Sequence, residues 1–164
     1  MSTPPSPPSV GALTYRIRPA VVGDLKAIQQ LLQPYVEARK LLKRTRQELL
    51  NLMENGFVAE VPAGEGDSQL VGFSAVEIYS RKLSEIQCLC VADGYQGHGI
   101  GSELVRHCID RARQRGVLEV MAISASDNFL RNLGFDYSLP DQKRALFYQL
   151  KTREQLAQET PDDL

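Results

Sequence analysis

Three glycines alternate with larger residues at Gly97, Gly99 and Gly101, between an apolar segment and an amphipathic one. Such a loop gathers several backbone N–H groups at the start of a helix, where the helix dipole is positive and anions bind. Glycine has no side chain to hold a phosphate away, and Gln96 and Ser102 add polar groups at the rim. The spacing predicts a phosphate site, with a turn that serves packing alone as the alternative.

The spacing of this loop also restricts the kind of phosphate ligand. A mononucleotide P-loop closes with Gly-Lys-Ser/Thr, whereas Gly101 and Ser102 are adjacent without the lysine, which disfavours ATP. A dinucleotide fingerprint needs G-x-G-x-x-G and an acidic residue at the end of the next strand. Here the pattern is G-x-G-x-G, and Glu119 begins the next strand instead of ending it. A nicotinamide cofactor stays as a weak alternative.

Composition favours a small-molecule partner. The 164 residues, 43% of them hydrophobic, have the size and balance of one globular domain. Lys and Arg number 19 against 20 Asp and Glu, so the net charge of -1 gives no footprint for nucleic-acid binding. Neither a transmembrane run nor a signal peptide is visible, and we expect a cytoplasmic protein with no membrane partner. The oligomeric state stays open, with a homodimer as one option.

Metal binding is disfavoured by the spacing of the cysteines and histidines. Cys88 and Cys90 lie in one apolar run, and no second Cys or His pair at a matching spacing completes a tetrahedral shell. His98 falls in the glycine loop and His107 in the middle of a helix, where a packed or solvated histidine is the commoner role. With Cys108, we expect three free thiols and no metal.

The elements that position the loop can be predicted from periodicity and capping. Residues 14–18 alternate as a strand that stops at Pro19, and Asp24 can cap a helix with apolar residues at 25, 28, 31 and 32. Thr45 and Glu48 have the spacing of a capping box for a helix over 45–54, ended by Gly56. We further expect strands over 57–61, 69–78 and 85–92, a helix over 100–115, a buried strand over 117–124, a short helix over 128–133 and a last strand over 145–150. The result is a mixed α/β domain of six or seven strands.

The two ends of the chain differ in composition from its centre. Residues 1–12 are rich in Pro and Ser, and we expect a disordered leader. Residues 155–164 turn acidic and lose periodicity, which predicts a flexible tail. The globular domain is therefore expected over residues 13–154.

The loop and its surroundings resemble a known family. Gln96-x-x-Gly99-x-Gly101 after a strand is similar to the Q/R-x-x-G-x-G/A signature of the GNAT N-acetyltransferase superfamily. Leu133-Gly134-Phe135 after a short helix is similar to its late x-G-F element, and the βααβββ order before the loop fits its fold. The resemblance implies the GNAT acyl-CoA N-acyltransferase fold, a mixed six- or seven-stranded sheet flanked by about four helices. It also implies acetyl-CoA as co-substrate.

A narrower resemblance, to bacterial N-acetylglutamate synthase acetyltransferase domains, covers three separated segments. Residues 41–46 (LLKRTR) are similar to their L-x-R-R-S-R, Cys88 falls on their A-C-x-x-V strand, and residues 139–146 follow their L-P-x-x-K-x-x-L. This implies an amino-acid N-acetyltransferase acting on the α-amino group of glutamate or a related carboxylated amine. The amino-acid-kinase-like domain of the longer synthases is not expected in a chain of this length.

The resemblance implies roles for individual residues. The backbone of Leu89, Cys90 and Val91 would bond the pantetheine arm, and the loop would hold the pyrophosphate. The full set of implied cofactor contacts is Leu89, Cys90, Val91, Gln96, Gly97, His98, Gly99, Ile100, Gly101, Ser102 and Asn128. The implied acceptor contacts are Lys43, Arg44 and Lys151 for carboxylates, with Cys88 and Ser124 as further pocket residues. Lys43 and Lys151 replace arginines of the synthases, and Ala125 replaces a residue that is often polar or basic there.

Acyl transfer to an amine needs a neutral amine, a polarised thioester carbonyl and a leaving thiolate. Glu85, which begins the strand before the loop, resembles the superfamily's general base for direct attack in a ternary complex; an exposed strand-end carboxylate is the alternative. A backbone N–H near Leu89 or Cys90 would face the thioester oxygen and contribute about 3 kcal/mol. Leu130 stands where many relatives have a tyrosine acid, and because a thiol pKa is about 8.5, water or Tyr148 would suffice.

Two other functions stay open. The missing tyrosine at Leu130 motivates a non-catalytic CoA-binding regulatory module. A protein N-acetyltransferase is the other alternative, although the basic run from Arg39 to Arg46 favours a carboxylated acceptor over a protein substrate. An acyl-carrying Cys88 is disfavoured because no neighbouring feature lowers its pKa.

Overall fold

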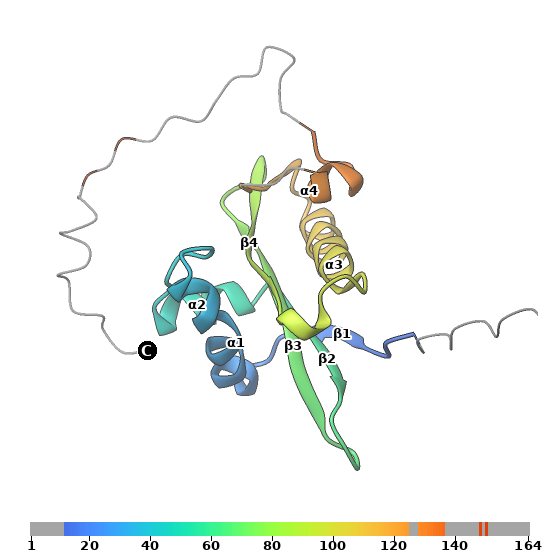
Figure 1. Ribbon diagram of the computed structural model, residues 1–164. Coiled ribbons are helices and arrows are strands. Elements are labelled where there is room, and N and C mark those ends of the chain that lie inside the picture. The colour runs from blue at the N-terminus through green and yellow to red at the C-terminus, as the bar shows by residue number, and fades with distance from the viewer. Residues whose placement is uncertain (1–11, 125–127, 137–147, 149, 151–164) are drawn as a thin grey trace, which may run out of the picture.

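A mixed sheet of five strands forms the centre of the described structure. The computed structural model describes residues 12–124, 128–136, 148 and 150 (Figure 1). The strands lie in the order β1-β2-β3-β4-β5, antiparallel from β1 to β4 and parallel between β4 and β5. Their bounds are Arg16–Pro19 (β1), Gly56–Pro62 (β2), Ser68–Ile78 (β3), Leu83–Val91 (β4) and Glu119–Met121 (β5). A parallel pair needs a long crossover, and a helix makes it here.

Helices cover both faces of this sheet. α1 (Leu25–Glu37) and α2 (Arg46–Met53) pack on one face and α3 (Ile100–Gln114), the crossover between β4 and β5, packs on the other (Figure 1). α4 (Asn128–Asn132) follows β5, and short 3₁₀ turns, η1 (Val22–Asp24) and η2 (Asp93–Tyr95), precede α1 and α3. None of the helices in the described ranges is long and apolar enough to cross a membrane.

The core is divided into two clusters by the sheet. Val58 and Phe73 point toward α1 and α2, while Phe57 and Ala59 point toward α3. β2 is therefore apolar from Phe57 to Ala59, because a strand covered on both faces has no polar side, and its buried Glu60 is paired with Arg16 and Arg18. Each large side chain buried in this way contributes roughly 1.5–3 kcal/mol through the hydrophobic effect.

The predicted helix starts are confirmed in one case and wrong in another. Thr45 Oγ1 accepts from the Glu48 N–H at 3.2 Å and Glu48 accepts from the Thr45 N–H at 2.7 Å, the predicted capping box. Asp24 does not cap α1 with its side chain, because its carboxylate accepts from the Val21 N–H at 2.8 Å and from the Arg18 guanidinium. Gly56 begins β2, since α2 has already ended at Met53.

The sheet departs from the prediction at its carboxyl-terminal side. The strand expected over residues 117–124 is limited to Glu119–Met121, which forms three residue pairs with β4 and is exposed to half-buried instead of buried. Five strands are thus described where six or seven were expected. The expected last strand lies outside the described residues apart from Tyr148 and Leu150, as do the tail and all of the leader except Ala12.

Candidate active site

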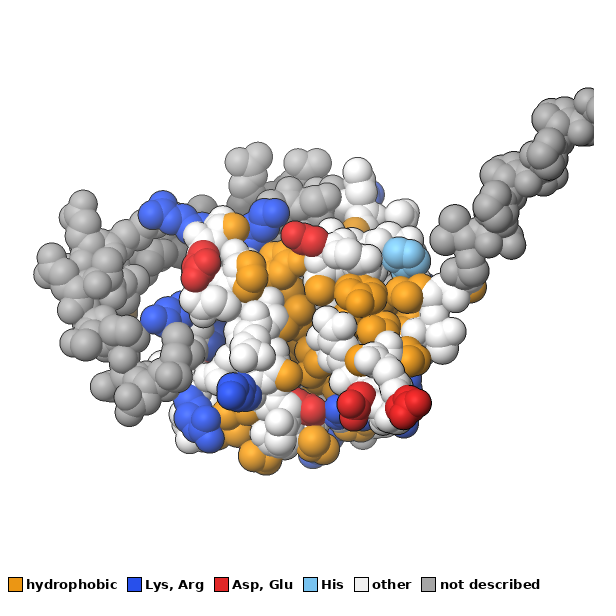
Figure 2. All heavy atoms as spheres, turned by 60° about the horizontal axis from the view of Figure 1, so that its bottom comes forward, with side chains coloured by type: hydrophobic (Ala, Val, Ile, Leu, Met, Phe, Trp, Pro, Cys, Tyr) orange, Lys and Arg blue, Asp and Glu red, His pale blue; other side chains and the backbone are white. Residues whose placement is uncertain are grey.

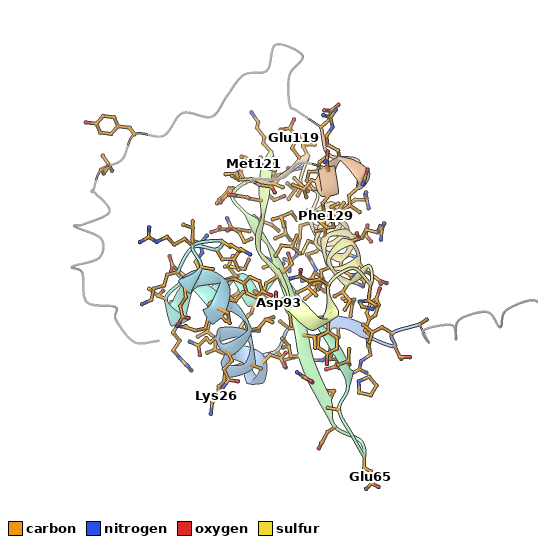
Figure 3. The ribbon with its side chains drawn as sticks, in the orientation of Figure 1. Lys26, Glu65, Asp93, Glu119, Met121 and Phe129 are labelled. Carbon is orange, nitrogen blue, oxygen red and sulfur yellow. The ribbon has the colours of Figure 1, made fainter. Side chains whose placement is uncertain are left out.

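β4 leaves most of one edge open. It pairs with β3 along its length, but its ladder with β5 ends at Glu85 and Met121 within the described residues. Figure 3 labels Met121, where this pairing ends, and Asp93, just past the end of β4, at opposite ends of the open stretch. A strand edge with unpaired N–H and C=O groups binds an extended chain by adding a strand. The open edge is thus suited to a linear amide such as pantetheine.

The three residues predicted to bond pantetheine differ in direction. The Ala92 N–H donates to the Val71 carbonyl of β3 at 2.8 Å. The backbone N–H and C=O groups of alternate residues point to the same neighbouring strand, so those of Cys90 also face β3, where Cys90 pairs with Phe73. Leu89 and Val91 face the open edge. The pantetheine contacts of Leu89, Cys90 and Val91 stay predictions.

A β-bulge at Cys88 interrupts β4 beside this edge. Phe73 pairs with Cys90 but Ala75 pairs with Gln87, so Cys88 and Leu89 together oppose Ser74. Cys88 has φ of 56°, in the left-handed region that a non-glycine residue adopts at a cost of about 1–3 kcal/mol. Bulges re-aim backbone groups next to active sites. The bulge at Cys88 turns the backbone near Leu89 out of the regular ladder. The N–H group predicted to face the thioester oxygen belongs to this stretch of backbone.

The glycine loop presents the start of α3. Gly97 and Gly99 have φ of 80° and 86°, and Gly99 caps α3 without a side-chain hydrogen bond. The first bond of the helix runs from Glu103 N–H to Gly99 C=O, so the N–H groups of Ile100, Gly101 and Ser102 precede it. The Ile100 side chain is 1% exposed in the core, which leaves only its backbone for a ligand. Three N–H groups at a positive helix end fit a pyrophosphate.

The Gln96 side chain points back to the end of β4 and connects the glycine loop to it through hydrogen bonds. Its Nε2 donates to the Val91 carbonyl at 2.9 Å and to Asp93 at 3.2 Å. The Tyr35 hydroxyl lies 2.8 Å from both the same carbonyl and Asp93. Burial and the Asp93 carboxylate raise the pKa of Tyr35 to about 12, so its hydroxyl stays a donor. No motif in the sequence points to Tyr35, which reaches β4 from α1. His98 Nδ1 stays within the loop, 3.0 Å from Gln96 O.

α4 lies over the first turn of α3. A Cβ added at Gly101 would lie 3.6 Å from the Phe129 ring and 3.8 Å from Val91, which is ordinary contact. The fold itself therefore does not need a glycine at this position, whereas a ligand close to the backbone would. Phe129, 36% exposed and labelled in Figure 3, lies beside the loop, and Asn128 before it is exposed at the start of α4.

The candidate base lies in a network of polar side chains that the sequence did not predict. Glu85 is the third residue of β4, not the first, and pairs directly with Glu77 of β3. The Tyr79 hydroxyl donates to Glu85 and lies 3.2 Å from Glu77. Burial, followed by the Glu85 carboxylate, raises the pKa of Tyr79 above its usual value, so the phenol stays protonated. Two carboxylates directly opposite each other are unfavourable in a sheet, and here the Tyr79 hydroxyl lies within hydrogen-bond distance of both.

Lys43 and Arg44 line a pocket between α1 and α2 of about 370 Å³. Gln29, Gln33 and Leu49 also contribute to its walls. Arg44 turns toward β4, where its Nη2 donates to Gln87 Oε1 at 2.8 Å. Several of the Lys and Arg side chains visible in Figure 2 lie on its left, the side of α1 and α2 in Figure 1.

Of the remaining predicted acceptor residues that the structure describes, Ser124 does not line this pocket. Ser124 is exposed after β5, and Lys151, Ala125 and residues 139–146 lie outside the described residues. Tyr148 is 89% exposed, and the structure does not bring it to β4. Leu130 is 8% exposed, so an apolar side chain packs where many relatives place a tyrosine.

The three cysteines are free and buried, as predicted. Burial raises the pKa of Cys90 and of Cys108 to about 12. Burial also raises the pKa of the Cys88 thiol, although the nearby Arg44 guanidinium opposes the change. A protonated thiol is a poor nucleophile. The arrangement therefore supports Cys88 as a wall of the site and not as an acyl carrier.

Proteins of known family resemble this chain over the same elements. An uncharacterized N-acetyltransferase of Chlorobaculum tepidum is 28% identical over 119 residues, which are 73% of this chain and 74% of that protein. An amino-acid acetyltransferase of Neisseria meningitidis is 32% identical over 128 residues, which are 77% of this chain and 28% of that protein. This chain thus spans less than a third of the length of the Neisseria relative.

Solved structures show the same fold. N-acetylglutamate synthase of Neisseria gonorrhoeae, complexed with coenzyme A and N-acetyl-glutamate, superposes with a TM-score of 0.66 at 30% identity, covering 79% of this chain and 30% of that one. A Mycobacterium tuberculosis protein in complex with CoA superposes with a TM-score of 0.67 at 26% identity, covering 87% of this chain and 79% of that one.

The sequence profile of the Acetyltransferase (GNAT) family matches residues 25–135, from the start of α1 to the residues just after α4. This match covers more than half of the chain and includes the bulged strand, its open edge and the glycine loop. The protein therefore belongs to the acetyltransferase (GNAT) family.

Proposed function

We propose that this protein transfers the acetyl group of acetyl-CoA to the primary amine of a small carboxylated acceptor, with glutamate as the leading candidate. The observation that carries the proposal is the open edge of β4, which leads from Glu85 past the Cys88 bulge to the N–H groups at the start of α3. One extended ligand with an amide arm and a pyrophosphate matches that order of groups.

The reaction is a direct attack in a ternary complex. Glu85 takes the proton from the acceptor ammonium, and the neutral amine attacks the thioester carbonyl carbon. Negative charge develops on the carbonyl oxygen, where a backbone N–H near Leu89 stabilises it. The C–S bond then breaks and the CoA thiolate leaves, while the new amide loses its second proton to solvent.

The acceptor class rests on charge and on the relatives. Lys43 lies in the wall of the pocket between α1 and α2, and Lys and Arg gather on that side of the molecule. An ammonium attracts a carboxylate as a point charge, without the bidentate geometry of arginine. The Neisseria meningitidis relative carries the name amino-acid acetyltransferase, which supports an amino acid as the acceptor.

An acceptor screen tests the proposal. The purified chain is incubated with acetyl-CoA and a panel of amino acids and simple amines, and the release of free CoA thiol is measured. Lys43→Met is expected to raise the acceptor KM about tenfold with kcat kept, since a charge-assisted contact is worth about 1.5 kcal/mol or more. Lys26→Met is the matched control, because Figure 3 shows Lys26 on α1 pointing away from the sheet.

The screen also separates the alternatives. Thiol release with uncharged amines and none with amino acids would contradict a carboxylated acceptor. CoA binding in calorimetry without turnover on any amine would favour a CoA-binding regulatory module, which the buried Leu130 independently suggests. Failure to bind acetyl-CoA or CoA at millimolar concentration would overturn the whole proposal.

A further inference from the structure

An unbroken chain of side-chain hydrogen bonds leads from the pocket to the candidate base. Arg44 donates to Gln87 Oε1 at 2.8 Å, and Gln87 Nε2 lies 3.3 Å from the Tyr79 hydroxyl oxygen. Arg44 has only donors and the Gln87 amide nitrogen only donates, so the direction of each bond is fixed. The Tyr79 oxygen accepts from Gln87, and its single proton is left for a carboxylate.

We propose that Tyr79 is a positioning residue for Glu85, oriented by Gln87 and Arg44. The inference rests on the proposed function, in which Glu85 takes the acceptor proton. Tyr79 lies just after β3 and donates to Glu85 across the β3–β4 pair. A donated hydrogen bond both orients a carboxylate and favours its ionised form, the form in which a base accepts a proton.

The surroundings of Glu85 contain opposing influences. Glu77 is its direct partner on β3, which places two like charges opposite each other. The β5 partner of Glu85 is Met121, with Glu119 two residues before it. Arg44 and Glu48 act electrostatically on the Cys88 thiol further along β4. The β3–β4 turn also carries Arg81 and Lys82. Tyr79 therefore supplies a neutral hydrogen-bond donor to Glu85 beside the Glu77 carboxylate.

The two neighbours predict shifts of opposite sign. In Tyr79→Phe the carboxylate loses a donor, so the acid limb of the kcat/KM profile moves to higher pH by about one unit. In Glu77→Gln a like charge is removed, so the acid limb moves to lower pH by about half a unit. A residue that only supports the fold would lower activity without moving the limb in a direction set by its charge.

The controls are matched in chemistry. Tyr15→Phe removes another phenol that donates to a glutamate, Glu103 at 2.6 Å, and Glu65→Gln removes an exposed carboxylate at the tip of the β2–β3 hairpin. Both are expected to leave the acid limb in place. A readout that needs no turnover is the ¹³Cζ resonance of Tyr79. Its titration should move to lower pH in Glu85→Gln and stay unchanged in Glu65→Gln.

Each outcome decides one point. Opposite shifts in Tyr79→Phe and Glu77→Gln support the inference. Unmoved acid limbs in both variants, with turnover intact, overturn it and leave the proposed function standing. A Tyr79 resonance that titrates alike in the wild-type chain and Glu85→Gln overturns it as well. Absence of turnover in the wild-type chain would overturn the proposed function, and the role of Tyr79 with it.

Discussion

Gly101 allows a test that separates ligand binding from folding. A Cβ placed there meets Phe129 at 3.6 Å and Val91 at 3.8 Å, distances of ordinary packing, and its φ is not in the left-handed region. Alanine is favoured over glycine inside a helix by up to about 1 kcal/mol. Gly101→Ala is therefore expected to melt at the wild-type temperature or about 2–4 °C above it.

Binding should change in the opposite direction. The N–H of Gly101 is one of three that precede the first bond of α3, and a methyl group beside it keeps a pyrophosphate from close approach. Hydrogen bonds to a charged group are worth about 1.5–3 kcal/mol, so losing one of them weakens CoA binding about 10- to 100-fold. Higher stability with lower affinity is a combination that general damage to the fold does not produce.

The assay is thermal melting followed by calorimetry with CoA. Gly23→Ala is the control, because a Cβ there meets nothing within 4 Å and Gly23 lies in η1, outside the loop. Its CoA affinity should equal that of the wild-type chain. Wild-type affinity in Gly101→Ala, or an equal loss in Gly23→Ala, would refute the assignment of the loop as the pyrophosphate site.

Three further outcomes are expected. The Arg18 guanidinium lowers the pKa of Asp24 below its usual 3.8, so the stabilisation from this ion pair is present above that pH and is lost as pH falls below it; urea unfolding should show a smaller acid loss in Asp24→Asn. Cys90 and Cys108, with pKa values raised to about 12, should resist iodoacetamide at pH 8 in the folded chain; rapid alkylation found by mass spectrometry would contradict this burial. Thr45→Ala removes the capping bond of α2 and should lower the melting temperature by about 2–4 °C, whereas an unchanged melt would show that the cap adds nothing.

Local signals in the sequence were sufficient for the elements that end in caps or glycines. The capping box at Thr45, the helix beginning at Ile100 and the buried β2 each depend on residues within one turn or one strand. Asp24 shows the limit of that reasoning. Its carboxylate has the right spacing to cap α1, but Arg18 from β1 and the Val21 N–H at the start of η1 take it instead. The contact with Arg18 depends on the placement of β1, which no capping pattern implies.

The candidate site was only partly predictable, because its geometry depends on distant pairing. The glycine loop could be located from its own residues. The bulge at Cys88, by contrast, follows from how β4 registers against β3, and no alternation in the sequence reveals a two-against-one pairing. Tyr79 was missed for the same reason, since its contact with Glu85 exists only once β3 and β4 pair.

The buried Leu130 bears on how the thiolate leaves. A tyrosine acid at this position would have to reach the sulfur, but the residue here is apolar and 8% exposed. Leaving does not require it, because a thiol with a pKa of about 8.5 departs as a thiolate at modest cost near neutral pH. In the proposed reaction, catalysis then depends on the attacking side, where Tyr79 and Glu77 lie beside Glu85 and Gln87 donates to Tyr79. Variants of those residues should therefore change the rate more than any substitution at Leu130 that preserves its packing.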